Sequence, residues 1–186
     1  MIIGLTGKFA AGKGAAADFF KAHGFSYLSL SDILREELTA RGLATSRENL
    51  IATGQALRRE AGAAVLAQRA VARLAEHSED IVIDSIRSPA EVAALRRLPG
   101  FFLLGIDAPA ETRYARLKAR GRIGDSESLE EFIRHEAAED TADPHGQRLT
   151  ATLALADTVL PNDAGLEQLT ARLEQLLHGL CARKPS

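Results

Sequence analysis

The sequence contains a single cysteine, Cys181, among its 186 residues. One cysteine excludes an intramolecular disulfide framework and fits a reducing compartment. No apolar run approaches the ~18 residues of a membrane-spanning helix, and core-like residues follow the first methionine directly, so we expect neither a membrane segment nor a signal peptide. The net charge of −2 argues against a large basic surface for nucleic acid. We therefore expect a cytoplasmic protein, a monomer or small homo-oligomer, that acts on small molecules.

Short apolar segments alternate along the chain with segments of helical character. The length and the 46% hydrophobic content predict one domain with a sizeable core. Because short apolar strands separated by helices are typical of parallel sheets, the pattern predicts an α/β fold with helices on both faces of a five-stranded parallel sheet. The expected strands are 2–5, 25–29, 81–84, 101–106 and 158–160.

The most informative stretch follows the first expected strand. Gly7, four further residues and then Gly12-Lys13 have the spacing of a phosphate-binding loop between a strand and a helix. Glycine lets backbone amides turn inward around a phosphate, and the following helix directs its free N–H groups at the same anion. Lys13 adds a positive charge and is a candidate catalytic residue. The loop residues expected to contact a nucleotide are Gly7, Lys8, Ala10, Ala11, Gly12, Lys13, Gly14 and Ala15.

The loop departs from the usual pattern at the two positions after its lysine. Related loops place there a serine or threonine whose hydroxyl binds Mg²⁺, whereas this chain has Gly14 and Ala15. Magnesium often binds through one carboxylate, phosphates and water. Asp84, at the end of the third expected strand, is the candidate carboxylate, and its alternative role is to cap the helix near Ser88.

Other polar residues follow the ends of the expected strands, where ligands of parallel sheets bind. Arg35 and Arg87 are candidates to hold an acceptor phosphate, since guanidinium groups match phosphate bidentately, but either arginine could instead form a surface ion pair. Asp32 is a candidate base that orients an attacking hydroxyl, or else a helix cap with Ser31. Arg59, with its neighbour Arg58, could border the same cleft.

Two arginines four residues apart, Arg116 and Arg120, share one face of the helix that begins near Pro109. They are candidate contacts for the phosphate donor, or else a solvated stripe, and Arg122 follows them. From 121 to 147 the chain is polar, charged and interrupted, and its acidic run is expected to be a solvated face. Thr45-Ser46-Arg47-Glu48 has the spacing of a capping box at a helix start.

With these motifs, the chain resembles the P-loop nucleoside monophosphate kinases, and more narrowly the dephospho-coenzyme A kinases and their uncharacterised relatives. The resemblance covers nearly the whole chain. It implies a three-layer P-loop fold with a core of 1–31, 79–120 and 148–186, acceptor-binding helices in 32–78 and a lid in 121–147. The stretches that carry it, besides the loop, are Ser31-Asp32-Ile33-Leu34-Arg35, Ile83-Asp84-Ser85-Ile86-Arg87, the arginine-rich 116–122 and the C-terminal 156–169 with Asn162.

The resemblance implies an activity, two cofactors and roles for the candidate residues. ATP with Mg²⁺ would be the donor, and the γ-phosphate would pass to a nucleoside monophosphate or dephospho-coenzyme A. Lys13, Asp32 and Arg120 would act in catalysis. Arg116, Arg120 and Asn162 would contact the donor, and Asp32, Arg35, Arg59 and Arg87 the acceptor. The missing loop hydroxyl keeps open an alternative, a nucleotide-binding protein with slow ATPase or regulatory activity and no kinase turnover.

Overall fold

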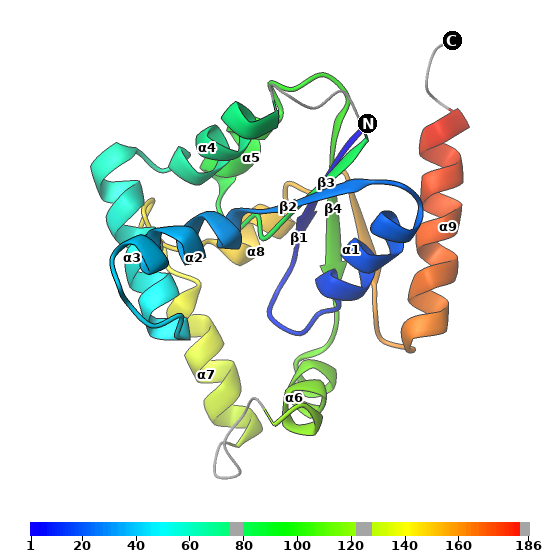
Figure 1. Cartoon of the computed structure of the whole chain (residues 1–186). Helices are drawn as coiled ribbons and strands as arrows, with labels where there is room; N and C mark the ends of the chain where they lie inside the picture. Colours follow the sequence, from blue (N-terminus) through cyan, green and yellow to red (C-terminus); the bar gives the residue numbers. More distant parts are fainter. Residues whose placement is uncertain (75–79, 122–127, 183–186) are drawn as a thin grey trace.

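The computed structural model describes residues 1–74, 80–121 and 128–182. Its described strands form one five-stranded sheet of order β2-β3-β1-β4-β5, and all neighbouring strands run parallel, as predicted (Figure 1). The sheet is short and central, and the strand that carries the loop lies in its middle. The strands are β1 (Ile2–Thr6), β2 (Ser26–Ser29), β3 (Ile81–Asp84), β4 (Phe101–Asp107) and β5 (Thr158–Pro161).

Helices cover both faces of the sheet, which confirms the predicted three-layer α/β architecture (Figure 1). Alternate strand residues belong to different apolar clusters, because successive side chains of a strand point to opposite faces. Ile81 and Ile83 pack with α2, α4 and α5, whereas Val82 packs with α1 and α9. The helices are α1 (Lys13–Ala22), α2 (Leu30–Ala40), α3 (Arg47–Ala61), α4 (Val65–Leu74), α5 (Pro89–Leu95), α6 (Ala110–Ala119), α7 (Leu129–Glu139), α8 (Leu149–Leu153) and α9 (Leu166–Ala182).

Two helix starts differ from the sequence expectation. Helix α2 begins at Leu30, and its cap is Ser29, whose Oγ accepts a hydrogen bond from the Ser31 amide at 3.2 Å. Asp32 therefore lies inside the first turn, so neither it nor Ser31 is the cap. Helix α3 is capped by Ser46, one residue later than the predicted capping box, and Ser46 Oγ accepts from the Asn49 amide.

The polar region after Gly121 contains a regular helix, α7, that the sequence pattern did not predict. Ser128 caps α7 in a reciprocal box with Glu131, and Phe132 is buried against Leu117 of α6. In Figure 1, α6 and α7 lie below the sheet, at the end toward which the phosphate loop points, and α3 lies beside α7. These elements enclose the carboxyl edge of the strands. Residues 122–127, including Arg122 and the start of the acidic run, lie outside the described residues.

Candidate active site

The backbone of the phosphate loop requires glycine at two positions. Gly7 has φ +140°, and a Cβ there would overlap the carbonyl oxygen of Ile106 on β4. Gly12 has φ +117°, and a Cβ there would overlap the side-chain amide of Asn162. Both positions thus combine a left-handed backbone with close packing, which only glycine tolerates. The loop is held against β4 and the residue after β5, ready to direct its amides at an anion.

The ammonium group of Lys13 lies over the loop. Its Nζ donates hydrogen bonds to the carbonyl oxygens of Gly7 at 2.7 Å and of Lys8 at 3.0 Å. Burial first and the positive charge of Arg87 second lower the pKa of Lys13 to about 8, against an opposing contribution from Asp84. A lysine with a depressed pKa beside a second cation has lost water and gained no full counter-charge. A bound anion would supply that charge.

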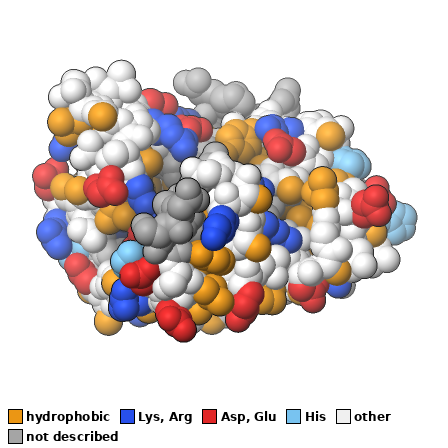
Figure 2. Space-filling view, turned by 90° about the horizontal axis from the view of Figure 1, so that it is seen from below, with side chains coloured by type: hydrophobic (Ala, Val, Ile, Leu, Met, Phe, Trp, Pro, Cys, Tyr) orange, Lys and Arg blue, Asp and Glu red, His pale blue; other side chains and the backbone are white. Residues whose placement is uncertain are grey.

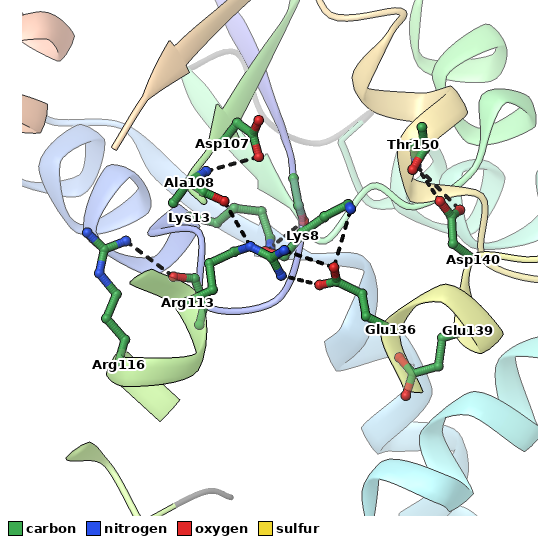
Figure 3. A network of polar contacts seen from close by, with 12 residues as sticks. Lys8, Lys13, Asp107, Ala108, Arg113, Arg116, Glu136, Glu139, Asp140 and Thr150 are labelled. Atoms are coloured by element: carbon green, nitrogen blue, oxygen red, sulfur yellow. Dashed lines mark hydrogen bonds and ion pairs between the residues drawn. The ribbon is translucent and has the colours of Figure 1, made fainter. Parts of the chain in front are cut away.

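Helix α7 contacts the loop through Glu136 (Figure 3). Its carboxylate pairs with Lys8 Nζ at 3.3 Å and accepts two hydrogen bonds from the guanidinium of Arg113, on α6. Arg113 is buried, and its Nε also donates to the carbonyl oxygen of Ala108 at 2.9 Å. A charge network therefore links the loop, α6 and α7.

A cavity of about 250 Å³ opens beside the loop, between α2, α3 and α7. One part of its wall is apolar and consists of leucine, isoleucine and phenylalanine side chains; the other part carries arginines, two glutamates and small polar groups. A site with an apolar wall and a few polar groups is typical of small-molecule binding. Its lining residues are Phe9, Leu30, Ser31, Leu34, Arg35, Arg47, Leu50, Ile51, Arg58, Leu66, Ser85, Arg87, Glu136, Glu139, Gln147 and Leu149.

Three of the four arginines that line the cavity pair with a carboxylate. Arg58 is 3% exposed and donates to Glu91, which is fully buried, at 2.8 Å. Arg47 pairs bidentately with Glu139, with distances of 2.9 and 2.7 Å. Arg35 pairs with Asp32 on the exposed face of α2. These pairs neutralise most of the basic charge that the sequence places here.

Arg87 is the exception among the arginines of the cavity. It is half-buried, and its Nη1 donates to the neutral amide oxygen of Gln147 at 2.9 Å. Within the described ranges, no carboxylate forms a salt bridge with it. Its backbone is fixed by the Glu91 carboxylate, which accepts from the Arg87 amide at 2.8 Å. Burial lowers the pKa of Arg87, so this cation too lacks full compensation.

On the opposite side of the loop, Arg116 and Asn162 hold the backbone of residues 10–11. Arg116 Nη2 donates to the carbonyl oxygen of Asn162 at 2.9 Å, and Asn162 Nδ2 donates to the carbonyl oxygen of Ala11 at 2.7 Å. Arg120, the other expected donor contact, caps the C-terminus of α6 and is exposed. In the structure, Arg116 and Asn162 therefore lie against the loop, whereas Arg120 lies one helical turn farther along α6.

The remaining candidates lie at different depths. Asp84 is half-buried at the end of β3; its Oδ1 accepts from the Ser85 amide and its Oδ2 from the Tyr27 hydroxyl at 3.3 Å. The helix after it is capped by Ser88, so Asp84 is not the cap. Asp32 and Arg59 are absent from the cavity lining, and Arg59 is exposed and pairs with Asp143 at 3.6 Å.

Several residues of the site were missed at the level of sequence. Arg47, Arg113, Glu136 and Gln147 reach the loop or the cavity from segments far apart in the chain. The capping signal of Ser128 and Glu131 could have revealed α7, but nothing local shows that Glu136 faces Lys8.

Seen from the α6–α7 end, side chains of both signs are interspersed with hydrophobic ones (Figure 2).

Magnesium fits this site as a partner of the nucleotide rather than of a protein cage. Among the described residues, no group of three or more histidine, cysteine, aspartate or glutamate side chains is arranged to hold a metal. Asp84 is close enough to Lys13 to raise its pKa, and each of its oxygens has one donor, which leaves lone pairs for water. This is the donor set expected where phosphates and water provide most ligands.

Solved structures with the same architecture include several kinases. The structure of TT1252 from Thermus thermophilus is 23% identical, covers 100% of this chain and 98% of its own, and superposes with a TM-score of 0.58. Shikimate kinase from Acinetobacter baumannii, in complex with shikimate, is 16% identical, covers 99% and 95%, and has a TM-score of 0.58. These likenesses show the fold: the chain shares the three-layer α/β architecture of these structures, with a phosphate loop after β1.

Proteins with similar sequences show which family this chain belongs to. A family model described as an AAA domain matches residues 3–139. A UPF0200 protein of Hyperthermus butylicus is 33% identical over 97% of this chain and 95% of its own, and one of Methanoregula boonei is 35% identical over 96% and 97%. The chain belongs to the family of this AAA domain model and to the UPF0200 proteins. In the described part of the chain, no helix is both long and apolar enough to cross a membrane.

Proposed function

We propose that this protein is an ATP-dependent phosphotransferase that moves the γ-phosphate of ATP to a nucleotide or nucleotide-like acceptor. A nucleoside monophosphate or a nucleotide-like molecule such as dephospho-coenzyme A is the expected class of acceptor. The phosphate loop and the kinase-like fold support nucleotide binding. The cavity beside the loop supports a second substrate, since a protein that only binds ATP has no use for it.

The relation between Lys13 and Arg87 carries the proposal. Both cations are partly buried, each has neutral hydrogen-bond partners, and the charge of Arg87 lowers the pKa of Lys13. Two such cations repel each other across a poorly solvated space. Phosphate groups between them would remove the repulsion and form charge-assisted hydrogen bonds. Lys13 belongs to the loop and Arg87 to the cavity wall, so together they fit a donor and an acceptor phosphate.

On the donor side, the loop amides of residues 7–15 and Lys13 would hold the β- and γ-phosphates. Arg116 and Asn162 would support the loop and the rest of the nucleotide, and Arg120 would join when the α6–α7 segment closes. Magnesium bound with ATP would neutralise phosphate charge, and Asp84 would hold its water. Phosphoryl transfer needs mostly positioning and charge neutralisation, which these groups provide.

On the acceptor side, Arg87 would hold the acceptor phosphate, with Arg35 and Arg59 at the outer edge. The apolar wall of α2 and α3 would contact the body of the acceptor. Asp32 would have to leave its ion pair with Arg35 to act as a base, so we assign it an orienting role at most. Helix α7 closes the cavity and limits access of water, which otherwise competes with the acceptor.

One observation favours a second function, ATP binding with slow hydrolysis and no acceptor. Gly14 and Ala15 offer no hydroxyl to Mg²⁺ at the loop. A purified protein incubated with ATP and Mg²⁺ separates the two functions when nucleoside monophosphates, deoxynucleotides and dephospho-coenzyme A are added singly. Kinase activity predicts ADP formation that depends on one acceptor class and is abolished in Lys13→Ala. Slow ADP formation that no acceptor changes would instead identify the second function.

A further inference from the structure

Ser85 adopts a backbone conformation that non-glycine residues rarely occupy. It directly follows β3, has φ +66° and is half-buried at the wall of the cavity. A left-handed conformation at a residue with a Cβ is strained, and such residues concentrate at functional sites. Its amide donates to the Asp84 carboxylate at 2.5 Å, which helps to fix the conformation. Nothing in this backbone requires a hydroxyl group.

The hydroxyl of Ser85 is oriented by the start of α2. Ser29 Oγ accepts from the Ser31 amide at 3.2 Å and donates to Ser85 Oγ at 3.2 Å. Ser85 Oγ therefore serves as acceptor in this chain of hydrogen bonds, and its own proton remains to be donated. Among the described residues, Ser29 is the one side chain with a hydrogen bond to the Ser85 hydroxyl, so this hydroxyl has capacity for a further hydrogen bond.

We propose that the Ser85 hydroxyl donates a hydrogen bond to the phosphate acceptor and so contributes to its recognition. The inference rests on the proposed function and adds to it a contact at the floor of the cavity, two residues before Arg87. The partner atom on the acceptor is an oxygen or nitrogen lone pair. Arg87 would hold the anionic group, and Ser85 would select molecules with a hydrogen-bond acceptor beside it.

The backbone strain at Ser85 supports this assignment, because glycine at the same position would remove the strain. Glycine adopts φ +66° freely, so Ser85→Gly would relieve the backbone while the Asp84 contact to the amide remained possible. The serine thus keeps a strained backbone together with a hydroxyl on a residue of the cavity wall. Stability and acceptor binding are expected to respond differently at this position, which makes the two separable.

Three substitutions distinguish the hydroxyl from the backbone. Ser85→Ala removes the hydroxyl and keeps the strain, Ser85→Gly removes both, and Ser85→Thr keeps the hydroxyl and adds a β-branch that fits this conformation poorly. We expect Ser85→Ala and Ser85→Gly to raise the KM for the acceptor about fivefold, the equivalent of one net hydrogen bond, with the KM for ATP unchanged. Ser85→Thr should keep an acceptor KM close to that of the wild type.

Melting temperatures should follow a different order. Ser85→Gly should melt about 2–4 °C above Ser85→Ala, and Ser85→Thr below it, as expected for changes of backbone strain in a chain of this size. If Ser85→Ala and Ser85→Gly kept the wild-type acceptor KM, the proposal would be wrong even though the kinase was active. If the wild type formed ADP without dependence on any acceptor, the proposed function would fail, and the Ser85 contact with it.

Discussion

The Glu136 carboxylate of α7 lies between Lys8 of the phosphate loop and the buried Arg113 of α6. It also contributes to the electrostatic environment of Lys13, whose pKa it raises. A negative charge at this place competes with phosphate for the same cations. The protein thus holds an internal carboxylate beside the phosphate loop, and α7 is attached to the loop through it.

Removal of this negative charge should strengthen ATP binding. Glu136→Gln keeps the side-chain shape and hydrogen-bonding oxygen but leaves Lys8 and Arg113 without a counter-charge. We expect the Kd for ATP to fall severalfold, and the effect to shrink at high salt. Glu130→Gln on the exposed face of the same helix is the matched control, since it changes the net charge equally away from the loop. Unchanged or weaker ATP binding in folded Glu136→Gln would contradict this role.

ATP binding should weaken as the pH rises above 8. The pKa of Lys13 in the free protein is about 8, below its ordinary value, so the ammonium loses its proton above that pH. Phosphate favours the protonated lysine, so at pH 8–9 binding must take up a proton. Calorimetry in buffers of different ionisation enthalpy should detect the uptake, which should disappear in Lys13→Ala. Equal affinity at pH 7 and pH 9 would show that Lys13 is not in contact with phosphate.

The lowered pKa of Lys13 also determines whether the free energy of unfolding rises or falls with pH. Between about pH 8 and the unfolded value near 10.4, the unfolded chain binds more protons at Lys13 than the folded protein does. The contribution of Lys13 to the free energy of unfolding is therefore unfavourable below pH 8 and improves as the pH rises through this window. In urea titrations, Lys13→Met should lack this improvement. A matching pH profile in the variant would assign the effect to another group.

Arg87→Ala should weaken the acceptor far more than ATP. Loss of a hydrogen-bonded contact to a charged group costs about 1.5–3 kcal/mol, or roughly 10- to 150-fold in the acceptor KM. Arg97→Ala is the comparison, because Arg97 is exposed and outside the cavity lining, and it should change the acceptor KM little. An effect of Arg87→Ala confined to ATP would assign Arg87 to the donor.

The substitution Gln147→Glu tests the role of Arg87 while keeping the arginine in place. Gln147 accepts from Arg87 at 2.9 Å, so Gln147→Glu would place a carboxylate where the neutral amide now lies. Arg87 would then have a permanent counter-charge, and the acceptor phosphate would have to displace it. We expect a raised acceptor KM with an intact fold, measured by steady-state kinetics and circular dichroism. If Gln147→Glu lowered the acceptor KM, Arg87 would not be its anion site.

The buried pair of Arg58 and Glu91 should contribute to stability and, through it, to the position of Arg87. Glu91 accepts from Arg58 with one oxygen and from the Arg87 and Ser88 amides with the other. Arg58→Met leaves a buried carboxylate without its partner, which typically costs about 3–5 kcal/mol. The double variant Arg58→Met with Glu91→Gln should recover part of this loss in denaturant titrations. An undiminished loss in the double variant would assign the effect to the packing of Arg58.

The phosphate loop could be predicted from sequence because its signal is local. Gly7, Gly12 and Lys13 follow a strand and precede a helix, and the structure confirms that order. The alternation of strands and helices likewise predicted the parallel sheet. Asn162 was expected at this edge of the sheet because it follows the last strand, but its contact with Gly12 was not predicted, since residues 150 apart meet through the order of the strands.

Long-range pairing accounts for what the sequence did not predict. Arg58 and Arg35 look alike as charged residues on helices, yet Arg58 is buried against Glu91 and Arg35 pairs on the surface with Asp32. Only the contact between Arg58 on α3 and Glu91 on α5 distinguishes them. The left-handed backbone of Ser85 had no signal at all, because serine does not favour that conformation.

Arg47 contacts two elements around the cavity besides its own helix. Its guanidinium stacks 4.7 Å from the centre of the Phe9 ring in the phosphate loop, while it pairs with Glu139 of α7 from the first turn of α3. One side chain therefore connects the phosphate loop, α3 and α7. Any ligand that moves it from one contact disturbs the other two. Thermodynamic linkage then makes the influence mutual: the factor by which ATP alters acceptor affinity equals the factor by which the acceptor alters ATP affinity.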